Sequence, residues 1–298
     1  MRPAEAASCS ARSLAAEEPL VGTASRYRSW LMIEQPGPWG HDALVESGFP
    51  PDVGIRLRDL GARLRMRVLL IKRRARPWPA ASRRCFVAHT GQVERALRTF
   101  EIEHPDELLG MDLAALSRER FADAGHPVDG PLFLVCTHGK HDPCCARRGA
   151  PLYRALADRP DAWECTHIGG DRFAGNLVCF PHGVYYGRVP PARAPEIADA
   201  YARGLIDLEH YRGRSPYPPA VQAGEHLLRE LHGLDGVDDL VLVAHRAEGG
   251  GIHRVRFTDP GGAEREVMVR VSLGEGRALT CKAVELHPAR KFSAVEET

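Results

Sequence analysis

Residues 136–183 hold the side chains best suited to chemistry. Five of the chain's eight cysteines and four of its fourteen histidines lie there. Cys136 and Cys145 are separated by eight residues, and His167 and Asp171 follow as a His-x3-Asp pair. Thiolate and imidazole are soft and borderline ligands, so a group this dense indicates a metal or redox site.

The segments between these residues favour convergence on one centre. The polar loop 137–144 contains Gly and Pro and can curl so that the cysteines on both sides of it point the same way. Gly169 and Gly170 allow the chain to come close to that centre, because no Cβ stands in the way. His167 and Asp171 would then face the same point from one turn.

Length and composition limit the class of protein. A chain of 298 residues has room for two compact domains, or for one domain with an appendage. No apolar run approaches the roughly 18 residues that span a bilayer, and the first residues lack the apolar core of a secretory signal. We therefore expect a cytoplasmic protein with no membrane contact, whose cysteines are reduced or bound to metal.

The charge is unevenly distributed. Eleven Lys or Arg residues lie in segment 55–84 against one acid, Asp59. Such a basic segment indicates an acidic partner or an anionic ligand, or else a solvated, arginine-rich helix and strand edge. No nucleic-acid motif accompanies it, so we expect no nucleic acid partner.

The hydrophobic pattern predicts which elements position the site. An apolar strand ends just before Cys136, and a helix, a strand, a hairpin and a second helix follow it. This order is an α/β plan of thioredoxin-like type. The predicted ranges are 132–135, 149–156, 163–167, 177–180 with 184–189, and 194–211.

The same pattern predicts four parts of the chain. Residues 1–24 read as a disordered tail in which Cys9 has no role. Residues 25–127 read as an N-terminal α/β region with strands at 30–33, 67–71 and 85–89 and helices at 52–64 and 106–121. Residues 128–214 read as a thioredoxin-like domain. A proline-rich linker at 212–219 leads into a small α+β appendage, residues 215–298. The appendage is predicted to contain a helix at 221–231 and strands at 239–245, 252–258, 264–272 and 278–286. Cys281, within the last of these strands, reads as an isolated thiol.

Three stretches resemble a known family. The first stretch is Cys-Thr-His-Gly from Cys136. The second is Thr-His-Ile-Gly-Gly-Asp-Arg-Phe-Ala-Gly-Asn from Thr166, and the third is Phe-Pro-His-Gly-Val-Tyr-Tyr-Gly-Arg from Phe180. Together they are similar to the sucrase/ferredoxin-like family. Trp-Leu-Met-Ile-Glu-Gln-Pro-Gly-Pro-Trp from Trp30 resembles its bacterial branch. The resemblance extends over residues 25–215.

The resemblance implies a thioredoxin-like ferredoxin with a [2Fe–2S] cluster, held by a Cys-x8-Cys pair and, in eukaryotic members, by a His-x3-His pair. Carried over, the ligands are Cys136, Cys145 and His167, while Asp171 stands where the second histidine would be. The fourth ligand is then Asp171, or a neighbouring side chain, or the cluster is incomplete or absent. The neighbouring candidates are Cys165, His138, His141 and His182.

These observations favour an electron carrier or redox sensor that works with an unidentified redox partner protein. A zinc-bound structural module is a second hypothesis, and a thiol oxidoreductase that uses Cys144 and Cys145 is a third. No carboxylate pair, P-loop, dinucleotide fingerprint or nucleophile triad suggests a hydrolase or another enzyme. The sequence gives no indication of the oligomeric state.

Overall fold

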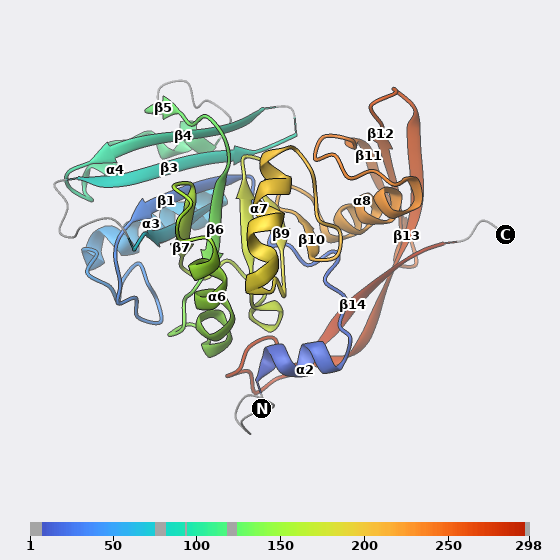
Figure 1. Ribbon diagram of the computed structural model, residues 1–298, viewed down its shortest axis with the longest axis horizontal. Coiled ribbons are helices and arrows are strands. Elements are labelled where there is room, and N and C mark those ends of the chain that lie inside the picture. The colour runs from blue at the N-terminus through green and yellow to red at the C-terminus, as the bar shows by residue number, and fades with distance from the viewer. Residues whose placement is uncertain (1–7, 75–81, 93, 118–123, 296–298) are drawn as a thin grey trace.

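A computed structural model describes residues 8–74, 82–92, 94–117 and 124–295 (Figure 1). Within these residues, ten strands form one mixed sheet in the order β10-β9-β8-β6-β7-β2-β1-β3-β4-β5, and four C-terminal strands form a separate antiparallel sheet. The α/β class is therefore confirmed. No described helix is both long enough and apolar enough to cross a membrane.

The first half of the large sheet is built around β1 (Ser29–Glu34), whose six residues are all buried. It pairs in parallel with β2 (Met66–Lys72) and antiparallel with β3 (Arg83–Thr90). Helix α3 (Pro51–Leu64) begins with proline, whose missing N–H has no partner at that position anyway. These predicted elements are confirmed. Strand β4 (Arg95–Ile102) pairs antiparallel with β3 on the side away from β1.

The second half of the sheet contains the site. Strand β6 (Leu132–Cys136) pairs in parallel with β7 (Ala162–Cys165) and antiparallel with β8 (Leu177–Phe180), which pairs with β9 (Val184–Tyr186). All of β6 is buried, because helices cover one face and the core cluster that contains Trp30, Trp163 and Phe180 covers the other. The covering helices are α6 (Pro143–Ala155) and α7 (Ala194–Ala202).

The two halves share one sheet, since Ile71 of β2 pairs with Cys165 of β7. The sheet therefore runs without interruption across the predicted boundary at residues 127 and 128. The division of the chain into domains stays a prediction.

Three predicted elements differ from the structure. The helix expected at 106–121 is two short helices, α4 (Glu107–Gly110) and α5 (Leu113–Ser117), and residues 118–121 lie outside the described part of the chain. The helix expected at 194–211 ends at Ala202, just before Gly204 adopts a positive φ. The expected linker is wrong in its first residues, because Tyr211–Arg214 form the buried strand β10 that pairs with β9.

The C-terminal part consists of helix α8 (Pro219–His232) against the antiparallel sheet. Its strands are β11 (Val241–Gly249), β12 (Ile252–Thr258), β13 (Glu264–Arg277) and β14 (His287–Ala294). The strand expected at 278–286 is instead the loop between β13 and β14.

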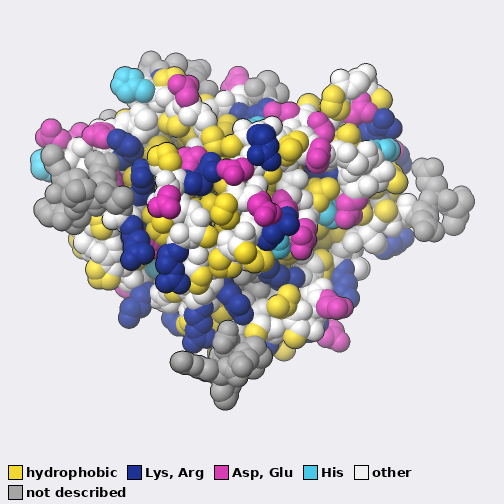
Figure 2. Space-filling model, viewed as in Figure 1, with side chains coloured by type: hydrophobic (Ala, Val, Ile, Leu, Met, Phe, Trp, Pro, Cys, Tyr) yellow, Lys and Arg dark blue, Asp and Glu magenta, His cyan; other side chains and the backbone are white. Residues whose placement is uncertain are grey.

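The mobile tail expected at 1–24 is wrong for helix α2 (Cys9–Ala15), which has three buried residues; residues 1–7 lie outside the described part of the chain. Figure 1 shows α2 beside the β13–β14 loop at the foot of the molecule. Figure 2 shows Lys and Arg side chains gathered on the lower left of the same face, around α6.

Candidate metal centre

Cys136 and Cys145 are placed by the two ends of a short loop. Cys136 is the last residue of β6, where its N–H donates to the Asn176 carbonyl at 3.1 Å. The loop ends at Asp142, which caps α6 by accepting the Cys144 N–H at 2.8 Å. Cys145 then falls in the first turn of α6, and both thiols are 1% exposed. The expected curl of the loop around one centre is present.

His167 and Asp171 come from the turn after β7. Gly169 and Gly170 both have positive φ angles, 95° and 82°, and a Cβ on Gly170 would lie 2.4 Å from the Arg212 guanidinium. The glycines are therefore needed for the backbone turn and for space beside Arg212. That turn brings Asp171 Oδ1 to 2.9 Å from His167 Nδ1.

These side chains form two groups that share His167. Ligand atoms of Cys136, Cys145 and His167 lie within 4.8 Å of one another, and those of His141, His167 and Asp171 do so as well. Cys145 Sγ donates to Asp171 Oδ1 at 3.0 Å. The Asp171 side chain is 3% exposed but the His167 side chain is 19% exposed, so the group reaches solvent on its histidine side.

The protonation states follow from this packing. The hydrogen bond from Cys145 lowers the pKa of Cys136 well below its usual value and raises that of Cys145. Burial alone would lower the pKa of His167, but the contacts with Asp171 and Cys136 outweigh it and raise that pKa to about 9. Burial would likewise raise the pKa of Asp171, but His167 outweighs it and the pKa is lowered. The contact between Asp171 and His167 therefore favours an ionised carboxylate beside a protonated imidazole.

The structure separates the candidates for a fourth ligand. Both ring nitrogens of His138 are occupied: Nε2 lies 2.6 Å from the Gly40 carbonyl oxygen, and Nδ1 accepts the His167 N–H at 3.3 Å. His182 lies at the β8–β9 turn, with Nδ1 2.6 Å from the Tyr201 hydroxyl. Cys165 pairs with Cys136 in the sheet, but its sulfur belongs to neither group of ligand atoms.

His141 remains beside Asp171 as a candidate. Its ring stacks on that of His167, with centroids 3.8 Å apart, and its Nε2 lies 3.9 Å from Asp171 Oδ2. Burial lowers its pKa to about 4, so the ring is neutral and able to bind a metal at ordinary pH. His41 stacks on the outer side of His141 at 5.4 Å. The sequence gives no sign of His41, because it lies about a hundred residues before the other histidines of the stack.

A second group of cysteines is also absent from the sequence prediction. Cys9 and Cys281, expected to be incidental and isolated, both contact Cys144. Their sequence separations from Cys144 are 135 and 137 residues, so no local spacing could indicate the contact. The adjacent residues Cys144 and Cys145 therefore face two different groups.

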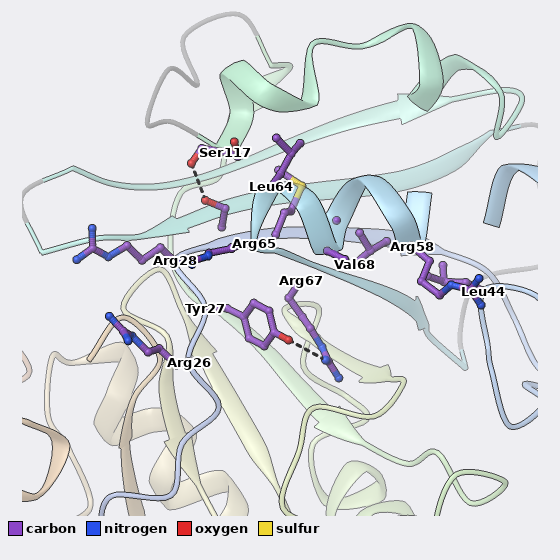
Figure 3. A pocket seen from close by; sticks show the side chains of 14 residues that line it. Arg26, Tyr27, Arg28, Leu44, Arg58, Leu64, Arg65, Arg67, Val68 and Ser117 are labelled. Carbon is purple, nitrogen blue, oxygen red and sulfur yellow. Dashed lines mark hydrogen bonds between the residues drawn. The ribbon is translucent and has the colours of Figure 1, made fainter. Parts of the chain in front are cut away.

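A pocket of about 770 Å³ lies near the centre and is rich in arginine (Figure 3). Among the described residues, no acidic side chain lines it, and Arg26, Arg28 and Arg65 form no ion pair. Arg67 connects it to the centre, since its guanidinium donates to the His167 carbonyl and also lies 3.4 Å from the Tyr27 hydroxyl. Two of these arginines, Arg65 and Arg67, belong to the basic segment 55–84, of which residues 75–81 lie outside the described chain.

Comparisons with known proteins agree on one family. The model of the Sucrase/ferredoxin-like family matches residues 20–213. A relative named "Altered inheritance of mitochondria protein 32" from Meyerozyma guilliermondii is 35% identical over 99 residues, which is 29% of this chain. Its counterpart from Eremothecium gossypii is 31% identical over 106 residues, which is 30% of this chain.

These matches cover 35% and 34% of the two relatives, so the chain corresponds to only a minor part of their length. The relatives are fungal, and the comparisons give no support to the bacterial branch. No solved structure matches the chain.

Proposed function

This chain belongs to the sucrase/ferredoxin-like family, and we propose that it binds a [2Fe–2S] cluster and works in one-electron transfer or redox sensing. The observation that supports this most strongly is the convergence of Cys136, Cys145 and His167, whose ligand atoms lie within 4.8 Å of one another. The three residues come from the end of a strand, the start of a helix and a glycine turn, so the fold holds all three in place.

The donor set fits a metal group. Two thiols and an imidazole are ligands that iron–sulfur proteins use. His167 Nδ1 is buried and makes no well-aligned hydrogen bond, although Asp171 Oδ1 is 2.9 Å away. A buried ring nitrogen without such a bond is unfavourable unless a further partner is present, and a metal would be that partner.

Each residue has a distinct part in this proposal. A cluster bound here would accept and release single electrons. Cys136 and Cys145 would hold it from the buried side, while His167, partly exposed, stands on the solvent side where electrons and protons can pass. Asp171 is the fourth ligand that we favour, with His141 as the alternative.

The positive charge around the centre supports a negatively charged group in it. Arg212 is 1% exposed and donates to the Gly169 carbonyl at 3.2 Å and to Asn176 Oδ1 at 2.8 Å. Burial lowers its pKa to about 10, which leaves the guanidinium charged at neutral pH. A buried cation without a paired carboxylate is costly, and a nearby anionic cluster would offset that cost.

The strand order supports the thioredoxin-like assignment. Strands β7, β6, β8 and β9 lie side by side in that order, with α6 between β6 and β7 and α7 after β9. β6 and β7 are parallel, and β8 and β9 are antiparallel to their neighbours. This is a βαβ unit followed by a ββα unit, the arrangement that the sequence predicts for residues 128–214.

We further propose a reducing compartment, such as the cytoplasm, and an acidic redox partner. All eight cysteines are free thiols, which fits a reducing environment. Arg26, Arg28 and Arg65 in the pocket have no ion-pair partner in the described part of the chain, and Arg67 of the same pocket contacts the His167 carbonyl, so a partner with a negative surface would be steered toward the centre.

A mononuclear zinc site is the second candidate, and one observation favours it. Zinc–ligand bonds of about 2.0–2.3 Å place tetrahedral donors roughly 3.3–3.8 Å apart. The observed donors lie within 4.8 Å of one another, which is nearer to this spacing than to that of a two-iron cluster, since a two-iron cluster requires the histidine side to move away from the thiols. A thiol oxidoreductase that uses Cys144 with Cys145 is not favoured, because both thiols are 1% exposed and face different groups.

Metal analysis decides between the two candidates. Protein purified anaerobically should be brown, contain iron and acid-labile sulfide in equal amounts, and lose its visible absorption when dithionite is added. One zinc per chain without sulfide would support the structural module instead, and protein that binds neither metal would contradict both candidates.

The fourth ligand is identified by two variants and a control. Asp171→Ala should lower the cluster content and shift the absorption spectrum, while His141→Ala should leave both close to wild type. His182→Ala, which removes a histidine outside both groups, serves as the control. The opposite pattern for Asp171 and His141 would assign the ligand to His141.

A further inference from the structure

The second group of cysteines brings together three distant segments. Cys9 begins α2, Cys144 lies in the first turn of α6, and Cys281 lies in the β13–β14 loop. The Sγ atoms are 3.6 Å apart for Cys9 and Cys144, 3.3 Å for Cys144 and Cys281, and 3.5 Å for Cys9 and Cys281. They form an almost equilateral triangle between α2, α6 and the loop, and Figure 1 shows α2 and this loop side by side.

The carboxylate of Asp142 lies beside this triangle of sulfur atoms and is a fourth potential ligand. Both oxygens of Asp142 lie 3.9 Å from Cys9 Sγ, and the residue is fully buried. Oδ1 accepts the Cys144 N–H at 2.8 Å, and Oδ2 accepts the Cys281 N–H at 2.6 Å. Each carboxylate oxygen has a second lone pair, so Asp142 can bind a cation while it keeps both hydrogen bonds.

The spacing fits a tetrahedral metal better than it fits a disulfide. Zinc–sulfur bonds of about 2.3 Å give sulfur–sulfur edges of roughly 3.8 Å, a few tenths of an ångström more than the observed edges. A disulfide would bring two sulfurs to about 2.05 Å and leave the third thiol buried without a role. All three residues are free thiols at nearly equal distances.

We propose that Cys9, Cys144, Cys281 and Asp142 bind a thiophilic divalent cation, Zn²⁺ in the cell, at a site separate from the centre at Cys136 and Cys145. This site ties the N-terminal helix and the C-terminal sheet to the start of α6. Because α6 also carries Cys145, the cation fixes the element that supplies a ligand to the first centre. Its binding free energy adds to the stability of the folded chain.

The test uses full-length protein in which the first centre is removed by Cys136→Ser and Cys145→Ser together. After treatment with EDTA, this variant is titrated anaerobically with Co²⁺ and then with Zn²⁺. One equivalent of Co²⁺ should bind with thiolate-to-cobalt absorption and tetrahedral ligand-field bands, and Zn²⁺ should displace it. Because this background lacks the first centre, failure of the proposed cluster would not affect the result.

Further variants in the same background assign the ligands. Cys281→Ser should weaken Co²⁺ binding by more than about 10-fold, and Asp142→Asn, which keeps the helix cap, by about 10- to 100-fold. Cys85→Ala is the matched control, because it removes a buried thiol of β3 that belongs to neither group. It should bind Co²⁺ as the background does.

A measurement on the wild-type chain covers the case in which the variants do not fold. Zn²⁺ should protect Cys281, the partly exposed cysteine of the group, from alkylation by a maleimide, and EDTA should abolish the protection, as read by mass spectrometry of peptides. Absence of cobalt–thiolate absorption in the folded background, alkylation that does not respond to Zn²⁺, or a disulfide between two of the three cysteines in metal-loaded protein would overturn the proposal.

Discussion

Gly149→Ala tests whether contact between α6 and the end of β6 sets the metal centre. A Cβ at residue 149 would lie 1.9 Å from the carbonyl oxygen of Cys136 and 3.0 Å from its carbonyl carbon. An ordinary contact begins at 3.4 Å, so α6 must move away from β6 by roughly 1.5 Å, a shift of the size that disables preorganised sites. Since Cys145 is on α6 and Cys136 ends β6, their separation changes by a similar amount.

The expected change in the free energy of unfolding of Gly149→Ala has two opposing parts. Alanine is favoured over glycine inside a helix by about 1 kcal/mol, whereas overpacking of a core costs about 1–3 kcal/mol or more. Backbone atoms cannot move aside as a side chain can, so we expect the high end of that cost and a net loss of about 2 kcal/mol. Urea denaturation should show this loss, and iron content should fall by more than half.

Gly110→Ala provides the control, because a Cβ there meets nothing within 4 Å. It should leave stability and iron content close to wild type. A Gly149→Ala protein that keeps the stability and the metal content of the wild type would refute the reasoning, because α6 would then not rest on β6 as described.

Two further perturbations follow from buried and exposed charge. Glu225 is fully buried and accepts hydrogen bonds from Arg214 at 2.9 Å and Arg229 at 3.0 Å. Glu225→Gln should therefore lower the free energy of unfolding by about 3–5 kcal/mol in denaturation experiments. Glu230→Gln, at an exposed residue, should leave that free energy almost unchanged. Burial would raise the pKa of Glu225, but the two arginines outweigh burial and lower that pKa. The stability that ionised Glu225 contributes is therefore present above the unfolded pKa of about 4.3 and is lost as the pH falls through the folded pKa. The free energies of unfolding of the wild type and of Glu225→Gln should therefore converge in acid. For the pocket, reversing charge with Arg26→Glu and Arg28→Glu should slow oxidation of the reduced protein by anionic ferricyanide and speed oxidation by cationic hexaammineruthenium, with both effects fading at high salt. Rates that do not depend on these arginines would contradict the docking role of the pocket.

The core of the fold could be predicted from the sequence because its signals are local. The apolar run 132–135 gives strand β6, and the spacing of Val53 and Leu57 gives helix α3, since in each case burial follows the period of the element. The convergence of Cys136, Cys145 and His167 could also be predicted, because short loops join the elements that carry them.

The rest depends on tertiary contacts. Arg212–Arg214 read as the start of a linker because of the nearby prolines, yet Arg212 and Arg214 are buried through specific hydrogen bonds and an ion pair with Glu225. The group of Cys9, Cys144 and Cys281 joins the two ends of the chain, and no local pattern encodes such a contact. The exclusion of His138 as a ligand required its partner Gly40, which lies 98 residues away in the sequence.

The central claim is that His167 and the thiols of Cys136 and Cys145 bind one iron–sulfur group. Pulsed EPR of the dithionite-reduced, anaerobically purified protein measures this most directly, because a bound imidazole couples its nitrogen to the unpaired electron. We predict a strong nitrogen coupling that is lost in His167→Ala and kept in His182→Ala. A reduced protein with no cluster signal, or with a signal whose nitrogen coupling survives His167→Ala, would contradict the account.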